Sequence, residues 1–211
     1  MGLRKYLWNF QASNSDILEE ELKKLEAFLD KNEIYCELLV LRCRRGDRQA
    51  FRELVETFER RLLYYLRRLT NDEQEAWDIL QQTWLKVLRS IRSIQDPRKF
   101  KSWIYTVAHR TAADRIRALS TEKSRREESD LDEIADENSD SEHFENAGLV
   151  HYGLGKLPID QREILTFFFL EEFSIAEIAD ILKLPDGTVK SRLHRARNAL
   201  WSVLIREGGH Q

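Results

Sequence analysis

The sequence predicts an all-α protein in which two small helical domains are joined by a flexible acidic linker and preceded by an N-terminal helical extension. Only 3 of the 211 residues are proline and 8 are glycine, a composition that favours helices over tight turns. No run of alternating β-branched residues is long enough to predict a sheet. Charge divides the chain: residues 41–117 hold 18 Lys and Arg against 10 Asp and Glu, whereas residues 118–147 hold 3 against 11.

Residues 1–40 form the predicted extension. Leu18, Leu22, Leu25 and Leu29 recur at the spacing of one helical stripe, which indicates an amphipathic helix with a buried apolar face. Two interpretations stay open. The helix packs onto the following domain, or it docks a regulatory protein.

Residues 41–119 form the first predicted domain. Its apolar residues repeat at helical spacing over three segments, 50–69, 76–88 and 100–108. The pair Asp96-Pro97 marks a loop before the third segment, because proline cannot continue a helix and biases the residue before it towards extended backbone. Trp103 lies in phase with the apolar residues of that third segment. We therefore expect its ring in the core.

Residues 120–148 form the predicted linker. They are polar, acidic and poor in large apolar side chains, so they cannot bury enough apolar area to fold alone. Repulsion between their like charges favours an extended chain. The sequence thus predicts a flexible tether between two positively biased surfaces, an arrangement that suits a nucleic-acid ligand.

Residues 149–206 form the second predicted domain, which ends in a helix-turn-helix pattern. Ser174 followed by Glu177 predicts a capping box at the start of the first helix, and Pro185 predicts the turn. The second helix has one aliphatic face, and its other face carries Lys190, Ser191, His194, Arg195 and Asn198. A short cationic helix propped on another helix can enter the major groove of DNA. The alternative is a cationic amphipathic hairpin at a domain end.

Four segments carry a family resemblance. Residues 187–197 read GTVKSRLHRAR, and upstream stand GDRQAFRELVETF, AWDILQQTWLKV and KFKSWIYTVAHRTAADRIR. The first resembles the fourth conserved domain of bacterial RNA polymerase sigma factors of the extracytoplasmic-function (ECF) class, in the sigma-70 family. The other three are similar to consecutive helices of that family's second domain. The resemblance implies an alternative sigma factor that binds core RNA polymerase, recognises −10 and −35 promoter elements and promotes DNA opening for transcription initiation.

The resemblance also implies three groups of site residues. Those facing the −35 element would be Gly187, Thr188, Lys190, Ser191, Arg192, His194, Arg195 and Arg197. Those facing the −10 element would be Arg98, Lys99, Lys101, Tyr105, His109, Arg110 and Arg117. Those docking core polymerase would be Asp78, Gln81 and Gln82.

The chemistry of these residues agrees with the implied roles. Arg and Lys can bind guanine in the major groove, and the N–H groups of Gly187 and Thr188 suit a phosphate. Aromatic and cationic side chains can hold a base extruded from the duplex. For Arg192 and Arg197, phosphate contact or solvation remains an alternative to base reading. For Gln81 and Gln82, the alternative is a solvated helix face.

Two positions depart from the family pattern. Gln82 stands where the family usually has Glu, so docking on polymerase loses one charge. His109-Arg110 stands where Arg-Asn is common, which keeps the cationic potential but leaves the −10 preference open.

We expect no cofactor, no metal site and no enzymatic activity. Cys36 and Cys43 have no second Cys pair or paired histidines near them, so buried free thiols are expected. Dense carboxylates occur only in the linker, which leaves a nuclease without ligands for a metal. A helix-turn-helix regulator that does not replace a sigma subunit is the other alternative, but it leaves residues 41–117 unexplained.

The expected location is the cytoplasm. No apolar stretch is long enough to span a membrane, and the first residues do not resemble a signal peptide. The implied partners are core RNA polymerase, promoter DNA and an anti-sigma factor, the last from resemblance alone.

Overall fold

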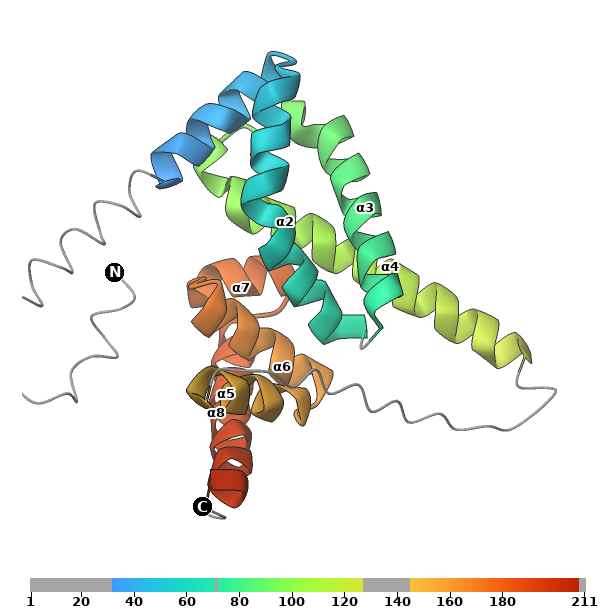
Figure 1. Ribbon diagram of the computed structural model, residues 1–211, viewed down its shortest axis with the longest axis vertical. Coiled ribbons are helices and arrows are strands. Elements are labelled where there is room, and N and C mark those ends of the chain that lie inside the picture. Colours follow the sequence, from blue (N-terminus) through green and yellow to red (C-terminus); the bar gives the residue numbers. More distant parts are fainter. Residues whose placement is uncertain (1–31, 71, 127–144, 209–211) are drawn as a thin grey trace, which may run out of the picture. The chain divides into compact units, whose positions relative to one another are not determined.

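A computed structural model describes residues 32–70, 72–126 and 145–208 of the protein (Figure 1). All regular structure in these ranges is helical, which confirms the predicted all-α class. A helix over residues 32–44 comes first. In chain order it is followed by α2 (Arg48–Thr70), α3 (Glu73–Ser90), the short turns η2 (Ile91–Ser93) and η3 (Pro97–Lys99), α4 (Phe100–Arg126), α5 (Glu145–Gly155), α6 (Ile159–Leu165), η5 (Thr166–Leu170), α7 (Ile175–Leu182) and α8 (Asp186–Gly208).

Parts of two predicted segments lie outside the described residues: the leucine stripe of the N-terminal extension and most of the acidic linker. The described ends of the linker continue α4 as far as Arg126 and begin α5 at Glu145. Among the described helices, none has the length and apolar character that crossing a membrane requires.

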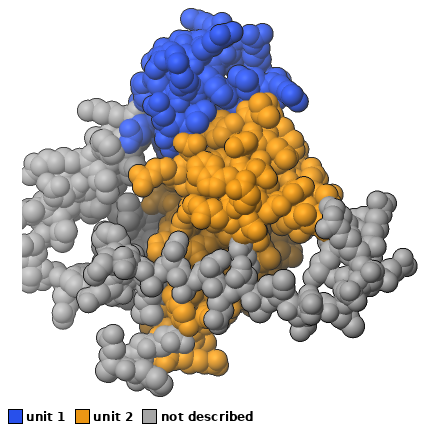
Figure 2. All heavy atoms as spheres, turned by 45° about the vertical axis from the view of Figure 1, so that its right-hand side comes forward, with its two compact units in different colours: residues 1–58, 87–101 blue, residues 59–86, 102–211 orange. Residues whose placement is uncertain are grey.

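The chain divides into two compact units, coloured separately in Figure 2. Unit 1 comprises Met1–Phe58 and Val87–Lys101, and unit 2 comprises Glu59–Lys86 and Ser102–Gln211. The described core of unit 1 consists of Leu39, Val40, Cys43, Ala50, Leu54, Phe58, Val87, Ile91, Ile94 and Phe100. In it the rings of Phe58 and Phe100 meet edge to face, with centroids 5.4 Å apart, a favoured aromatic arrangement.

The loop between α3 and α4 belongs to unit 1 and is shaped by Asp96 and Pro97. The Asp96 side chain accepts a hydrogen bond from the backbone N–H of Arg98, and Pro97 begins η3. Proline suits this first position because its missing N–H would have no helical partner there. The predicted loop is therefore confirmed, as a short helical turn.

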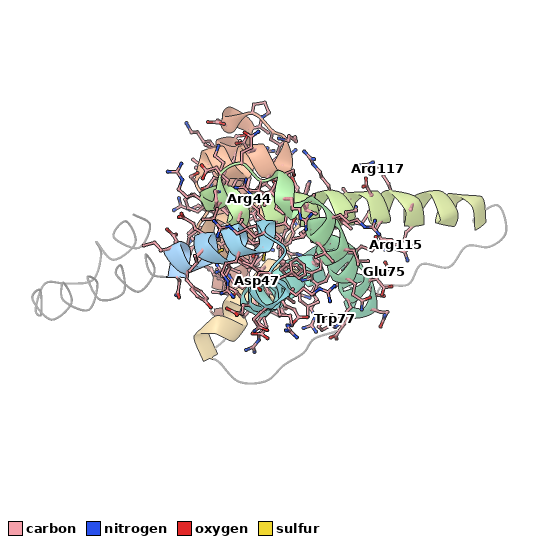
Figure 3. All side chains as sticks on the ribbon, turned by 90° about the horizontal axis from the view of Figure 1, so that it is seen from above. Arg44, Asp47, Glu75, Trp77, Arg115 and Arg117 are labelled. Atoms are coloured by element: carbon pink, nitrogen blue, oxygen red, sulfur yellow. The ribbon has the colours of Figure 1, made fainter. Side chains whose placement is uncertain are left out.

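In unit 2, α3 and α4 are joined by a two-pronged ion pair. Arg115 donates from Nε to Glu75 Oε2 over 2.7 Å and from Nη2 to Glu75 Oε1 over 2.8 Å (Figure 3). Hydrogen bonding and charge attraction from Arg115 lower the pKa of Glu75 below 4.5 despite partial burial. The parallel geometry is the favoured one for arginine with carboxylate.

The Glu75 carboxylate should make stability depend on pH. A lowered folded-state pKa stabilises the fold above the unfolded pKa, and this contribution is lost as pH falls through the folded pKa. Glu75→Gln should therefore flatten the acid side of a stability–pH curve below about pH 4.5. Urea denaturation at stepped pH measures this. Glu56→Gln, at an exposed position of α2, is the control, and equal curves for the two variants would contradict the expectation.

Three helices, α5, α6 and α7, pack against α8. Gly153 of α5 permits a close approach, because a Cβ there would lie 2.8 Å from Leu200 Cδ1. Arg162 of α6 is buried, and its Nη2 donates to the carbonyl oxygens of Gly155 and Leu157. These bonds satisfy the last carbonyl of α5 and one in the turn that follows it.

Candidate nucleic-acid interface

The helix-turn-helix is formed by α7 and α8. Ser174 Oγ accepts from the N–H of Glu177, and Glu177 Oε2 accepts from the N–H of Ser174 over 2.9 Å, which confirms the predicted capping box. Lys183 ends α7 in the left-handed region, with φ +56°. The carbonyl of Pro185 then accepts from the N–H of Thr188 over 2.8 Å, in the first turn of α8.

The two faces of α8 differ as the sequence predicts. Val189, Leu193 and Ala196 are buried. The exposed side chains are Lys190, Ser191, His194, Arg195, Arg197 and Asn198, while Thr188 and Arg192 are half-buried. A Cβ added at Gly187 would meet no other atom within 4 Å.

The cations on the exposed face of α8 are available to a ligand. None of Lys190, Arg192, Arg195 and Arg197 forms a salt bridge within the described part of the chain. The side-chain bonds on this face stay within the helix, such as Ser191 Oγ to the Thr188 carbonyl. A cationic helix face without bound carboxylates can bind the phosphates and base edges of DNA.

A second set of cations is carried by η3 and α4. Arg98, Lys99, Arg110 and Arg117 are exposed, and Lys101 is half-buried. Arg98 is held by Asp96, whose two carboxylate oxygens accept from its Nε over 2.9 Å and its Nη2 over 3.0 Å. This contact raises the pKa of Arg98 and lowers that of Asp96. A phosphate would have to share Arg98 with this aspartate.

The structure places Tyr105 in the core and Trp103 at a half-buried position, the reverse of the expectation from the sequence. The Tyr105 ring packs against Tyr65, Phe167 and Phe173, with centroid distances of 5.5, 5.8 and 5.2 Å. Burial and the charge of Glu171 raise its pKa. The physical reason for the reversal is the pair formed by Phe167 of η5 and Phe173, which follows that segment, because their rings cover Tyr105. In this arrangement Tyr105 cannot contact DNA.

His109 also takes part in a contact that the sequence did not reveal. Its Nδ1 lies 2.8 Å from Glu163 Oε1, which accepts a second hydrogen bond, over 2.6 Å, from the Tyr65 hydroxyl. Burial and the adjacent Glu163 carboxylate raise the pKa of Tyr65 well above 10. The only signal in the sequence is that Glu163 precedes Phe167 by four residues, which puts a carboxylate on an apolar helix face.

The candidate polymerase-binding side chains lie on α3. Gln81 and Gln82 are exposed, and Asp78 is half-buried and accepts from Gln74 Nε2 over 3.3 Å. The same helix carries two exposed residues that sequence reasoning missed. Leu85 is 53% exposed and Leu88 54%, although periodicity grouped Leu88 with the buried residues of this helix.

Residues able to bind a metal do not gather in the described structure. No group of three or more His, Cys, Asp or Glu side chains is close enough there to hold an ion. Burial raises the pKa of Cys36 to about 12 and that of Cys43 to about 11. Both thiols therefore stay protonated at neutral pH, which makes them poor ligands and nucleophiles.

Two family models match separate parts of the chain. Residues 54–122 match the family model of sigma-70 region 2, and residues 148–200 match that of sigma-70 region 4. RNA polymerase sigma-H factor of Pseudomonas aeruginosa is 32% identical over 185 residues, which cover 79% of this chain and 92% of the relative. The ECF sigma factor SigW of Bacillus subtilis is 30% identical, covering 74% and 90%. The ECF sigma-E factor of Escherichia coli K12 is 31% identical, covering 78% and 91%.

Solved structures show the same fold. Sigma factor RpoE in complex with anti-sigma factor NepR, from Bartonella quintana, matches with a TM-score of 0.61 at 23% identity, over 73% of this chain and 96% of that one. CnrH in complex with the cytosolic domain of CnrY matches with a TM-score of 0.57, over 82% and 98%. Together with the helix-turn-helix and the matched regions, the sequence relatives show that the chain belongs to the ECF class of sigma-70 family RNA polymerase sigma factors and serves promoter recognition in transcription initiation.

Proposed function

We propose that this chain reads the −35 promoter element with the exposed face of α8 while bound to core RNA polymerase. The observation that carries the proposal is the contrast between the two faces of that helix. One face is buried in the domain through Val189, Leu193 and Ala196. The cations of the other face form no ion pair with a carboxylate in the described part of the chain. Lys190 and Arg195 are the proposed base readers, since Arg and Lys donate to guanine O6 and N7. Arg192 and Arg197 are proposed phosphate contacts.

The −10 element is proposed to bind the cations of η3 and α4. Arg98, Lys99, Arg110 and Arg117 are exposed, and Lys101 is half-buried. His109 and Tyr105 are enclosed by side chains of α6 and η5. These two residues can hold an extruded base only after the side chains of α6 and η5 have moved away from them.

Docking on core polymerase is proposed for Asp78, Gln81 and Gln82 on α3. The amide at Gln82 can hydrogen-bond where the family's usual glutamate forms an ion pair. Because interfacial charges affect association rates more than affinity, the loss of this charge should slow docking more than it weakens the complex.

The remaining assignments follow from the same role. Residues 41–119 act as sigma domain 2, residues 149–206 as sigma domain 4, and residues 120–148 connect them. The structural relatives RpoE and CnrH are described in complexes with NepR and CnrY, and we extend an anti-sigma partner to this chain. It acts in the cytoplasm, where transcription takes place, and supplies binding rather than catalysis.

Reconstitution tests the proposal directly. The chain is mixed with core polymerase, complex formation is measured by pull-down, and run-off transcription is measured on promoters mapped by transcription start sites after overproduction of the chain. Binding to core and promoter-dependent transcripts are expected. A chain that binds DNA but not core would be a helix-turn-helix regulator instead, and the proposal would fail.

A further inference from the structure

The turn before α2 is built by one arginine and one aspartate. Gly46 has φ +87°, a conformation that favours glycine. Asp47 Oδ1 accepts from the N–H groups of Gln49 and Ala50 and so caps α2. Arg42 clamps the same carboxylate, with Nε 2.9 Å and Nη2 2.8 Å from Asp47 Oδ2. The turn needs no further cation for its own geometry.

Four more arginines nevertheless gather around this turn: Arg44, Arg45, Arg48 and Arg92. All four side chains are exposed, and none of their guanidinium groups forms an ion pair or hydrogen bond with another described residue. Arg92 comes from η2, and its Nη2 lies only 3.5 Å from the position that a Cβ on Gly46 would take. Arg44 and Asp47 are labelled in Figure 3, where this turn can be followed.

Helix stability explains only part of the set. Arg44 and Arg45 lie at the end of the helix over residues 32–44, where a cation interacts favourably with the helix dipole. Arg48 is the first residue of α2, where a cation is unfavourable for the same reason. Arg92 lies in η2, just beyond the C-terminal end of α3. The helix dipole therefore opposes the cation at Arg48, and four exposed cations at one turn repel one another. An anionic ligand would relieve this repulsion.

The ligand that best fits is the sugar-phosphate backbone of DNA. Guanidinium groups bind phosphate oxygens through paired hydrogen bonds, and a polyanion can occupy several arginines at once. The cluster is also continuous with the proposed −10 contacts. Arg92 opens the same loop that carries Arg98 and Lys99, and all three belong to unit 1.

We propose that Arg44, Arg45, Arg48 and Arg92 form an additional DNA phosphate-binding site around the Gly46 turn. The site contributes to affinity without reading sequence. It extends the promoter contact beyond the −10 residues named above, and it rests on the proposed function.

The salt dependence of promoter binding tests this site. For holoenzyme reconstituted from core polymerase and the full chain, the slope of log affinity against log salt falls by about 0.7–0.9 for each phosphate that the protein no longer neutralises. The variant Arg48→Ala/Arg92→Ala should lower the slope by about 1.4–1.8. The control Arg60→Ala/Arg206→Ala removes the same charge from two other exposed positions and should leave the slope unchanged.

Two further measurements complete the test. Arg48→Lys/Arg92→Lys keeps both charges and should retain most of the wild-type slope, which separates charge loss from misfolding. Pull-down with core polymerase should be equal for every variant. A slope equal to that of the control pair, or a loss of core binding by the test pair, would overturn the proposal. Failure of the proposed function looks different, because wild-type holoenzyme would then show no promoter binding beyond that of core alone.

Discussion

Phe167→Ala should lower the free energy of unfolding by about 3–5 kcal/mol, the usual cost of truncating a buried aromatic residue. Phe167 is fully buried in η5, and its ring packs against Tyr65 at 4.8 Å and Phe173 at 5.7 Å as well as against Tyr105. Removing it leaves a cavity bordered by three rings, which the surrounding helices can fill only in part. The free energy of unfolding of such domains is roughly 5–15 kcal/mol in total. The variant should therefore be marginally stable.

Phe169→Ala provides the matched control for this prediction. Phe169 belongs to the same η5 segment and has the same side chain, but it is 40% exposed. Its truncation should cost about 1 kcal/mol or less, in the range of surface substitutions. Urea denaturation followed by circular dichroism measures both. Equal losses for the two variants would show that the aromatic cluster is not a cooperative part of the fold.

Arg195→Ala should reduce transcription from promoters with the preferred −35 element by about 5- to 150-fold. This range corresponds to the loss of one good base contact, about 1–3 kcal/mol. Arg195 is exposed, and its Nε donates only to the Ser191 carbonyl of its own helix, over 3.4 Å. The guanidinium is therefore able to turn towards a base, and its removal should leave the fold intact.

The matched control for this prediction is Arg206→Ala, eleven residues further along α8 and also exposed. It loses the same charge and should keep transcription near the wild-type level. Binding to core polymerase should be unchanged for both variants. A parallel loss of core binding by Arg195→Ala would mean that this face of α8 contacts polymerase rather than DNA.

The helix-turn-helix could be predicted from the sequence because local rules determine it. The capping box, the turn at Pro185 and the alternation of Val189 and Leu193 with exposed cations depend on residues within one or two helical turns. Burial of such a stripe follows from its period alone. The faces assigned to α8 were therefore confirmed, while their base contacts remain predictions.

The environment of α4 could not be predicted in the same way. Tyr105 is buried by Phe167 and Phe173, which lie more than 60 residues later in the chain. The periodicity of one helix does not indicate such distant partners. Glu163 was missed for the same reason, since Tyr65 and His109 are distant in sequence. Leu88 shows the opposite error: it belongs to an apolar pattern but stays exposed.

The Tyr65–His109–Glu163 contact has a thermodynamic consequence for a ligand that uses His109 or Tyr105. Side chains of α6 and η5 compete with such a ligand, because the His109 imidazole and the Tyr105 ring cannot contact these side chains and a base at the same time. Every 1.4 kcal/mol by which this packing is favoured reduces the apparent affinity for a base held by His109 or Tyr105 about tenfold. The coupling is reciprocal: a base held by these two side chains destabilises their packing on α6 and η5 by the same factor.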